Sequence, residues 1–178
     1  MINQVKREIP DELLAHYGKE GFQGSCYRDG ASYKKAAPRV RAVVDPKRSK
    51  MVSGIKEALE KCGIRDGMVL SFHHHFRDGD YIVNMVMEQV AAMGVRDITI
   101  CASSLGAAHD PVAGYIEEGI VTGIQSSGVR GKIGEAISYG KLKTPAIIRS
   151  HGGRVRAIEE GDVHIDIAFI GAPTSDEY

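Results

Sequence analysis

The sequence lacks an excess of charge, a long hydrophobic run and closely spaced cysteines. Its 23 Lys and Arg residues balance 23 Asp and Glu residues, which argues against a coat for nucleic acid and against attraction to an anionic membrane. No run approaches the roughly 18 consecutive apolar residues of a membrane helix, and none follows the charged N-terminus as it would in a secretory signal. We therefore expect a cytoplasmic protein that binds neither nucleic acid nor a membrane.

The three cysteines, Cys26, Cys62 and Cys101, are far apart and form no CxxC pair. An odd number of distant cysteines argues against a disulfide framework or a zinc knuckle and favours reduced thiols. Glycine, by contrast, is abundant, with 21 of 178 residues. Many of these glycines separate one apolar run from the next, which predicts many tight turns between strands and helices.

The charge is unevenly distributed along the chain. Residues 1–50 hold 11 basic and 6 acidic residues, a balance of +5, whereas residues 51–178 hold 12 and 17, a balance of −5. Residues 1–46 are polar, are interrupted by Pro and Gly, and lack periodic apolar positions. We predict an extended or partly ordered arm over 1–46 and an α/β domain over 47–178. The arm's basic balance is typical of a solvated face, but an arm docking on another subunit would have the same pattern.

Apolar spacing predicts alternating helices and strands after the arm. The predicted helices are 51–62, 80–93, 110–119 and 131–138. The predicted strands are 68–72, 97–102, 120–125, 146–150, 155–158 and 164–170. Because the strands are apolar throughout and alternate with helices, the pattern predicts a mostly parallel sheet with helices on both faces.

Polar residues follow four successive predicted strands. Ligands of parallel sheets bind at the carboxyl ends of the strands, where these loops would meet. The loops offer hydroxyls, glycine amides, imidazoles and arginines, and so predict a site for an anionic ligand. The candidate substrate-binding residues are His73, His74, His75, Arg77, Ser127, Gly128, Arg130, Gly131, His151, Gly152, Gly153 and Arg154.

The three adjacent histidines have three interpretations: a substrate or thioester contact, structural hydrogen bonding, or a metal site. Imidazole binds several transition metals. In extended backbone, however, neighbouring side chains point to opposite faces, so His73 and His75 would share a ligand and His74 would not. No Cys or third histidine stands at recognisable ligand spacing, and we expect no metal.

Glycines at 128, 131 and 134 lie between a predicted strand and a predicted helix, where amides and the helix dipole can hold a phosphate. The segment matches neither the dinucleotide fingerprint nor the Walker loop, because Ile133 follows Lys132. Tight packing of the helix against the strand explains these glycines equally well.

The arginines and serines of the loops also have ordinary explanations. Arg77, Arg130 and Arg154 can fork onto a carboxylate or phosphate, or form surface salt bridges. No GxSxG elbow and no Asp-His partner pair accompanies the serines, which argues against a serine nucleophile. The serines considered are Ser71, Ser103, Ser104 and Ser127.

Several strings resemble one family. SFHHHFRDGDYIVNMVM, ASSL, SSGVRG, SHGGR and IDIAFIGAP, with REIPDEL and FQG in the arm, resemble citrate lyase alpha subunits, which are citrate CoA-transferases of the CoA-transferase superfamily. The resemblance covers nearly the whole chain and implies a CoA-transferase-like half. It also implies that citrate displaces acetate from an acetyl thioester on an acyl carrier protein, giving citryl-carrier and acetate.

The same resemblance implies partners and roles. The partners are a beta subunit that splits the citryl-carrier and an acyl carrier protein bearing a CoA-like phosphopantetheine group, within an oligomeric complex; this chain itself binds no cofactor. His73–His75 would lie near the thioester. Arg77, Arg130 and Arg154 would hold carboxylates or the carrier's phosphate. Citrate and citramalate remain alternative acceptors.

The chain also departs from the family pattern. Many CoA-transferases carry a glycine-rich stretch where this chain has His73–His75. Family members are longer, and their active site lies between two α/β halves, so we expect the catalytic carboxylate from a second half and no activity from this chain alone. The alternatives are a non-catalytic domain that binds a carrier or an anion, and a metal-dependent enzyme using His73–His75.

Overall fold

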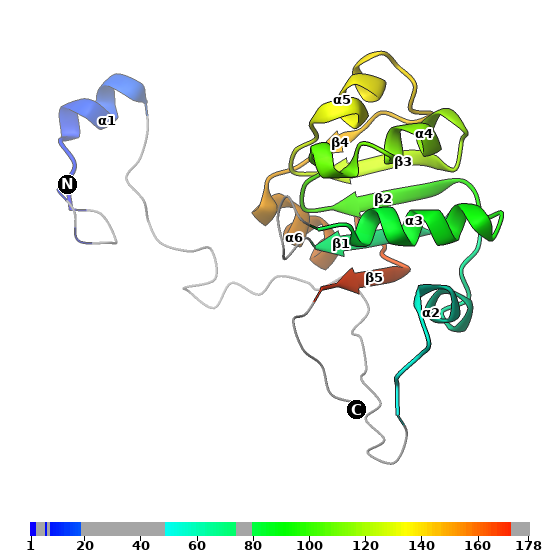
Figure 1. Ribbon diagram of the computed structural model, residues 1–178. Helices are drawn as coiled ribbons and strands as arrows, with labels where there is room; N and C mark the ends of the chain where they lie inside the picture. Colours follow the sequence, from blue (N-terminus) through cyan, green and yellow to red (C-terminus); the bar gives the residue numbers. More distant parts are fainter. Residues whose placement is uncertain (3–5, 7, 19–48, 74–79, 172–178) are drawn as a thin grey trace. The chain divides into compact units, whose positions relative to one another are not determined.

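The computed structural model describes residues 1–2, 6, 8–18, 49–73 and 80–171 (Figure 1). The chain divides into two compact units, residues 1–34 and 35–178. The first contains helix α1 (Asp11–Tyr17), which the sequence patterns did not predict and which has no buried residue. Gly18, with φ of 57°, ends the helix. The division of the chain at residue 46 stays a prediction.

The second unit is built on a five-stranded sheet in the order β4-β3-β2-β1-β5, and every neighbouring pair is parallel. This confirms the predicted parallel α/β architecture. Strands β1 to β4 advance in one direction, and β5 returns to the other side of β1 (Figure 1). The strand bounds are β1 Val69–His73, β2 Ile98–Ala102, β3 Val121–Ser126, β4 Ile147–Ile148 and β5 Ile167–Ile170.

Helices connect successive strands as the glycine pattern predicted. Gly63, Gly94, Gly119 and Gly140, each at positive φ, follow helices α2 to α5 and let the chain turn toward the next strand. The helix bounds are α2 Ile55–Lys61, α3 Ile82–Ala92, the 3₁₀ turn η2 Ala107–His109, α4 Val112–Glu117, α5 Gly131–Ser138 and α6 His151–Glu160.

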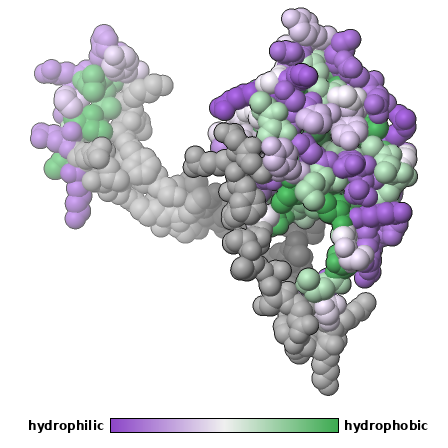
Figure 2. All heavy atoms as spheres, in the orientation of Figure 1, coloured by the Kyte–Doolittle hydropathy of each residue, from purple (hydrophilic) through white to green (hydrophobic). Residues whose placement is uncertain are grey.

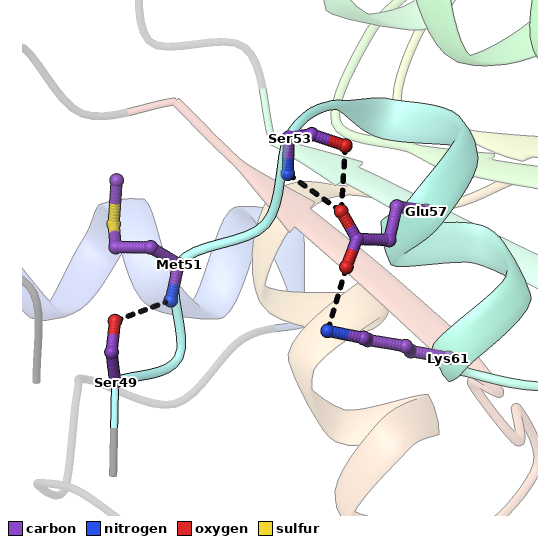
Figure 3. Close-up of polar contacts among 5 residues, drawn as sticks. All are labelled: Ser49, Met51, Ser53, Glu57 and Lys61. Atoms are coloured by element: carbon purple, nitrogen blue, oxygen red, sulfur yellow. Dashed lines mark hydrogen bonds and ion pairs between the residues drawn. The ribbon is translucent and has the colours of Figure 1, made fainter.

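A local network fixes the start of α2 (Figure 3). The carboxylate of Glu57 accepts hydrogen bonds from the backbone N–H of Ser53 at 2.7 Å and from its hydroxyl at 2.6 Å, and pairs with Lys61 at 2.7 Å. The hydrogen bond from Lys61, followed by those from Ser53, lowers the pKa of Glu57 from 4.5 to about 2. The charged carboxylate is therefore the form that holds this turn together.

Two apolar clusters show that helices cover both faces of the sheet. The larger cluster joins α2, α3, α4 and α5 to one face, through residues such as Leu59, Val86 and Ile133. The smaller cluster joins Cys101 of β2 to Ala157 of α6 and to Val163 on the opposite face. Figure 1 shows α6 behind the sheet and α3 in front of it. Of the named helices, α6 is thus the cover of the second face.

The predicted strand at 155–158 is wrong, because these residues belong to α6. The hydroxyl of Ser150 accepts a hydrogen bond from the amide of Gly153 at 3.0 Å and caps the helix start. Residues 151–154, predicted to be a loop, are therefore the first turn of α6. Two adjacent glycines and a short apolar run resembled a loop and a strand, whereas the cap and the packing of Ala157 favour a helix.

The surface seen in Figure 2 is largely polar and charged over α3, α4 and α5, with apolar residues gathered between α2, α3 and β5. Partly buried Ile55, Ile82 and Phe169 belong to these elements and pack on the larger cluster. Among the described residues, no helix has the length and apolarity needed to cross a membrane.

Candidate functional site

The pleat of the strands divides the side chains near their carboxyl ends between the two faces. Leu70 and Phe72 of β1 belong to the cluster under α3, so Ser71 and His73 fall on the face covered by α6. In β2, Cys101 packs against α6. Gln125 of β3, which pairs with Cys101 and follows Ile124 of the α3-side cluster, falls on that same face, and Ser103 and Ser127 come one residue after the two strands. The α6 face thus gathers polar side chains from β1 and β3.

Arg154 of α6 reaches under this edge of the sheet. Its Nη2 donates to the hydroxyl of Ser71 at 2.7 Å and to the carbonyl of Cys101 at 3.2 Å. Its Nε is buried and has no hydrogen-bond partner. In the described residues no carboxylate pairs with this guanidinium. The structure therefore places Arg154, half-buried and positively charged, beside the ends of β1 and β2.

A second arginine, Arg149, joins the neighbouring strand. Its Nη1 donates to the side-chain oxygen of Gln125 at 2.6 Å, and its backbone amide donates to the carbonyl of Ser126 at 2.9 Å. The next residue, Ser150, caps α6, and His151 and Gly152 are exposed at the start of that helix. These contacts bring the start of α6 to the same edge as β3 and β4.

Ser103 and Ser127 stand at equivalent positions, one residue beyond β2 and β3. Ser103 is only 2 % exposed, and both hydroxyls are buried without a hydrogen-bond partner. Their backbones are joined, since the amide of Ser127 donates to the carbonyl of Ser103 at 3.3 Å. The amide of Ser103 in turn donates to the carbonyl of Phe72 at 3.2 Å, which links the ends of all three strands.

The glycine-containing segment after β3 lies on the other side, at the start of α5. The amide of Leu105 donates to the carbonyl of Gly128 at 3.0 Å, and the amide of Arg130 donates to the carbonyl of Leu105 at 2.9 Å. The carboxylate of Asp110 accepts a hydrogen bond from the amide of Lys132 at 2.8 Å. One donor of the predicted phosphate cradle is therefore already satisfied by the protein.

Gly131 explains why a glycine is needed in this segment. Its φ is +64°, and a Cβ at this position would overlap the carboxylate of Asp110. Gly134 has only an ordinary contact, 3.5 Å from the carbonyl of Val129 to an added Cβ. The packing interpretation thus accounts for Gly131, while phosphate binding by this segment stays a prediction.

Two functional candidates were missed by the sequence reasoning, His109 and Asp80, each 3 % exposed. The Nδ1 of His109 lies 3.1 Å from the amide of Gly106, which donates to it, so Nε2 carries the proton and donates to the carbonyl of Asp80 at 3.0 Å. Asp80 also accepts from the amide of Ile82. No sequence pattern indicates this pair, because Gly106 has no side chain with which to form a helix-capping box with His109.

The predicted site residues therefore separate into three groups. His73, Ser127 and the first turn of α6 (151–154) lie toward one face, and Gly128, Arg130 and Gly131 lie at the start of α5. His74, His75 and Arg77 lie outside the described residues. Within the part of the chain that is described, no three metal-ligating side chains form a group. The metal hypothesis, which involves His74 and His75, is not tested by this arrangement.

A groove of about 1280 Å³ lies beside α5 and β4. Of the predicted site residues, it is lined by Gly128 and Gly131, together with residues of α5 and the segment leading to β4. Arg154 and His151, by contrast, belong to the first turn of α6. Binding of an anion depends on polar groups rather than on the volume of a groove. We therefore take the α6 side of the sheet edge as the candidate site.

Comparison with known proteins gives consistent matches. The model of the family "Citrate lyase, alpha subunit (CitF)" matches residues 48–178. The citrate lyase alpha chain of Haemophilus influenzae is 42% identical over 153 residues, 85% of this chain and 31% of that protein. The Escherichia coli alpha chain is 41% identical over 178 residues, 100% of this chain and 34% of that protein.

A solved structure agrees with these matches. The putative alpha subunit of citrate lyase from Streptococcus mutans, solved in complex with citrate, is 48% identical, with a TM-score of 0.77 over 98% of this chain and 33% of that chain. The chain thus spans about a third of the length of the relatives that it matches.

Proposed function

The chain belongs to the citrate lyase alpha subunit family, and we propose that it is the N-terminal part of a citrate CoA-transferase. In this proposal citrate replaces acetate on an acyl-carrier-protein thioester, and the products are citryl-carrier and acetate. The matched family model over residues 48–178 is the observation that carries the proposal. A relative 48% identical to this chain was solved with citrate, which supports citrate over citramalate as the acceptor in this proposal.

The polar edge of the sheet supports this chemistry. Citrate is a tricarboxylate, and guanidinium, hydroxyl and amide donors are its natural partners. Arg154, Arg149 and the exposed residues at the start of α6 offer such donors at this edge of the sheet. None of them is an acid that would repel the substrate.

Exchange at the thioester needs stabilisation of developing negative charge. A carboxylate oxygen of citrate adds to the carbonyl of the acetyl thioester. The tetrahedral oxyanion then collapses with loss of the carrier thiolate, which gives a mixed anhydride of acetate and citrate. The thiolate then adds to the citryl carbonyl, and acetate leaves. Imidazole and amide donors near the oxyanion lower both barriers, and removing one such donor typically costs roughly 100- to 1000-fold in rate. In the proposal His73, exposed at the end of β1, is one of these donors.

The proposal includes partners that supply the remaining chemistry. The catalytic carboxylate comes from the part of the relatives that this chain does not match, and the acyl carrier protein brings the phosphopantetheine thiol. A beta subunit then cleaves the citryl-carrier. The chain itself holds no cofactor, and the assembled complex is an oligomer in the cytoplasm.

Acetate release from acetyl-carrier on addition of citrate tests the proposal. We expect no exchange with residues 1–178 alone, and exchange when the remaining part of a relative's alpha chain is added. A mixture that binds citrate but never releases acetate would instead support a non-catalytic anion-binding domain.

Removal of metal tests the third candidate function, a metal-dependent enzyme. Exchange should continue unchanged after dialysis against EDTA of protein purified without a histidine tag. Loss of activity that zinc or another divalent metal restores would favour a metal-dependent enzyme centred on His73–His75.

A further inference from the structure

Three buried polar atoms without partners lie at one end of the sheet. They are the hydroxyls of Ser103 and Ser127 and the Nε of Arg154. Ser103 and Ser127 follow β2 and β3 by one residue and their backbones are hydrogen-bonded, and Arg154 binds Ser71 and the carbonyl of Cys101 near the ends of β1 and β2. Ser103 follows Cys101, whose carbonyl accepts from Arg154, by two residues, so it belongs to the strand end that the guanidinium contacts.

Unpartnered buried groups of this kind are costly to the fold. A buried hydroxyl or guanidinium N–H that has given up water without a replacement destabilises the native state, and most such groups in proteins find a partner. Three of them at one place, contributed by two strand ends and a helix, indicate a position that a ligand completes. All three can donate a hydrogen bond, so the missing partner is an acceptor.

We propose that Ser103, Ser127 and the guanidinium of Arg154 form a subsite for one carboxylate group of the substrate. A carboxylate offers only acceptors, its negative charge offsets that of Arg154, and its two oxygens can accept from the guanidinium and both hydroxyls. Ser103, absent from the candidates that the sequence indicates, is the central new residue. This subsite rests on the proposed function for the identity of its ligand, citrate.

The surroundings provide both a route and a supporting charge. Ser127 and Arg154 are half-buried, so other atoms of each residue reach the surface. The exposed start of α6 lies beside them, and its dipole favours an anion. Arg149, held by Gln125 on the same face, adds a second positive charge.

Replacing the buried hydroxyl tests the subsite. Citrate binding to the intact alpha chain in its complex, measured by calorimetry, should weaken roughly 10- to 100-fold in Ser103→Ala, the loss typical of one hydrogen bond to a charged group. The melting temperature without ligand should stay equal or rise, because the variant removes an unpartnered buried hydroxyl. Ser138→Ala, at an exposed position of α5 where the hydroxyl bonds only the carbonyl of Gly134 within its own helix, should leave the affinity for citrate unchanged.

The ligands tested distinguish the source of the anion. Citrate should bind to the wild type more tightly than acetate or inorganic phosphate, and Ser103→Ala should weaken the binding of citrate more than that of phosphate. Phosphate binding that depends on Ser103 more than citrate binding does would overturn the carboxylate assignment.

Failure of this inference differs from failure of the proposed function. Wild-type exchange of acetate for citrate with unchanged citrate affinity in Ser103→Ala would overturn the subsite and leave the function standing. Absence of exchange in the wild type, together with binding of citrate that depends on Ser103, would overturn the proposed function and leave the subsite standing.

Discussion

Asp110 and Gly131 show how one residue's conformation is imposed by another's carboxylate. Asp110, just before α4, accepts from the amide at the start of α5, and the backbone of Gly131 turns through positive φ to let it approach. The carboxylate takes the position that an anion would have at this helix N-terminus. The amide of Lys132, which looks available in the sequence, is therefore engaged within the protein.

Gly131→Ala should lower the free energy of unfolding by roughly 1–3 kcal/mol, since alanine at positive φ is strained and its Cβ meets Asp110. Gly134→Ala, in the same helix with only ordinary contacts, should be neutral or raise stability by up to about 1 kcal/mol. Urea unfolding of the two variants measures both. Equal effects from the two alanines would contradict the packing explanation.

Glu57 gives a residue-scale prediction in pH. Its pKa is lowered from 4.5 to about 2, so the folded state holds the charged form more strongly than the unfolded state does. The stabilisation is present above pH 4.5 and is lost as pH falls toward 2. The melting temperature of Glu57→Gln should therefore be below that of the wild type at pH 7, and the difference should close over this window.

Added salt distinguishes the contribution of Lys61 from that of Ser53 to the stabilisation by Glu57. Added NaCl should reduce the part that comes from Lys61, which is a solvent-exposed ion pair, more than the part that comes from Ser53. Glu60→Gln, which loses a looser 3.9 Å pair with Lys56, is the matched control and should show a smaller difference at pH 7. A pH-independent gap between Glu57→Gln and the wild type would contradict the assignment.

At the scale of elements, local pattern predicted those helices and strands whose signals agree with one another. Helix α5 has apolar positions at helical spacing and a glycine stop, and the prediction matches its bounds, Gly131–Ser138. Helix α6 has conflicting signals, because Gly152 and Gly153 weaken the start of a helix and Val155–Ile158 resembles a strand. What decides the outcome is the packing of Ala157 on Cys101, a contact between segments more than fifty residues apart.

The α6 assignment is testable through its first turn. Ser150→Ala should lower the free energy of unfolding by about 1 kcal/mol, because the cap on the amide of Gly153 is lost. Gly152→Ala, with open space around its Cβ, should raise stability by roughly 0.5–1 kcal/mol. Thermal unfolding measures both changes. If Gly152→Ala lowered the stability and Ser150→Ala left it unchanged, residues 151–154 would be a loop, as the sequence alone predicted, and not the first turn of α6.

At the scale of the whole molecule, the sequence predicted a common edge for the polar loops but not how the faces divide them. Arg130 and Arg154 look equivalent in sequence, since each follows a predicted strand and lies near glycines. The structure places Arg130 at the start of α5 and Arg154 under β1 and β2, on the α6 side. Face and register depend on strand order, which the separation of residues along the chain does not determine.

Strand order also explains why the candidate site includes α6. Strands β2 to β4 are added on one side of β1, and β5 on the other, so the chain must cross back from β4 to β5. That crossing segment is α6, and it covers the second face with its first turn near the ends of β1 and β2. The reversal of strand order beside β1 is where parallel sheets commonly bind ligands.

Opening of α6 from the sheet should therefore be coupled to ligand binding. Cys101 is 1 % exposed and packs on Ala157, and its carbonyl accepts from Arg154. With Cys26 and Cys62 replaced by serine, a thiol reagent should modify Cys101 only after α6 separates from the sheet. Where opening is fast relative to labelling and releases the ligand, citrate at 100 times its Kd should slow labelling about 100-fold.

Two comparisons make the coupling specific. Ser103→Ala should lose most of the protection at the same citrate concentration, because its affinity is lower, while its labelling without citrate stays close to that of the parent. A protein that keeps Cys62, which is exposed, and lacks Cys101 should label rapidly with or without citrate. If citrate binds but leaves the labelling of Cys101 unchanged, the ligand lies elsewhere and α6 moves independently of it. Protection that depends on Ser103 would instead show that binding of the carboxylate beside Arg154 is coupled to the closed position of α6.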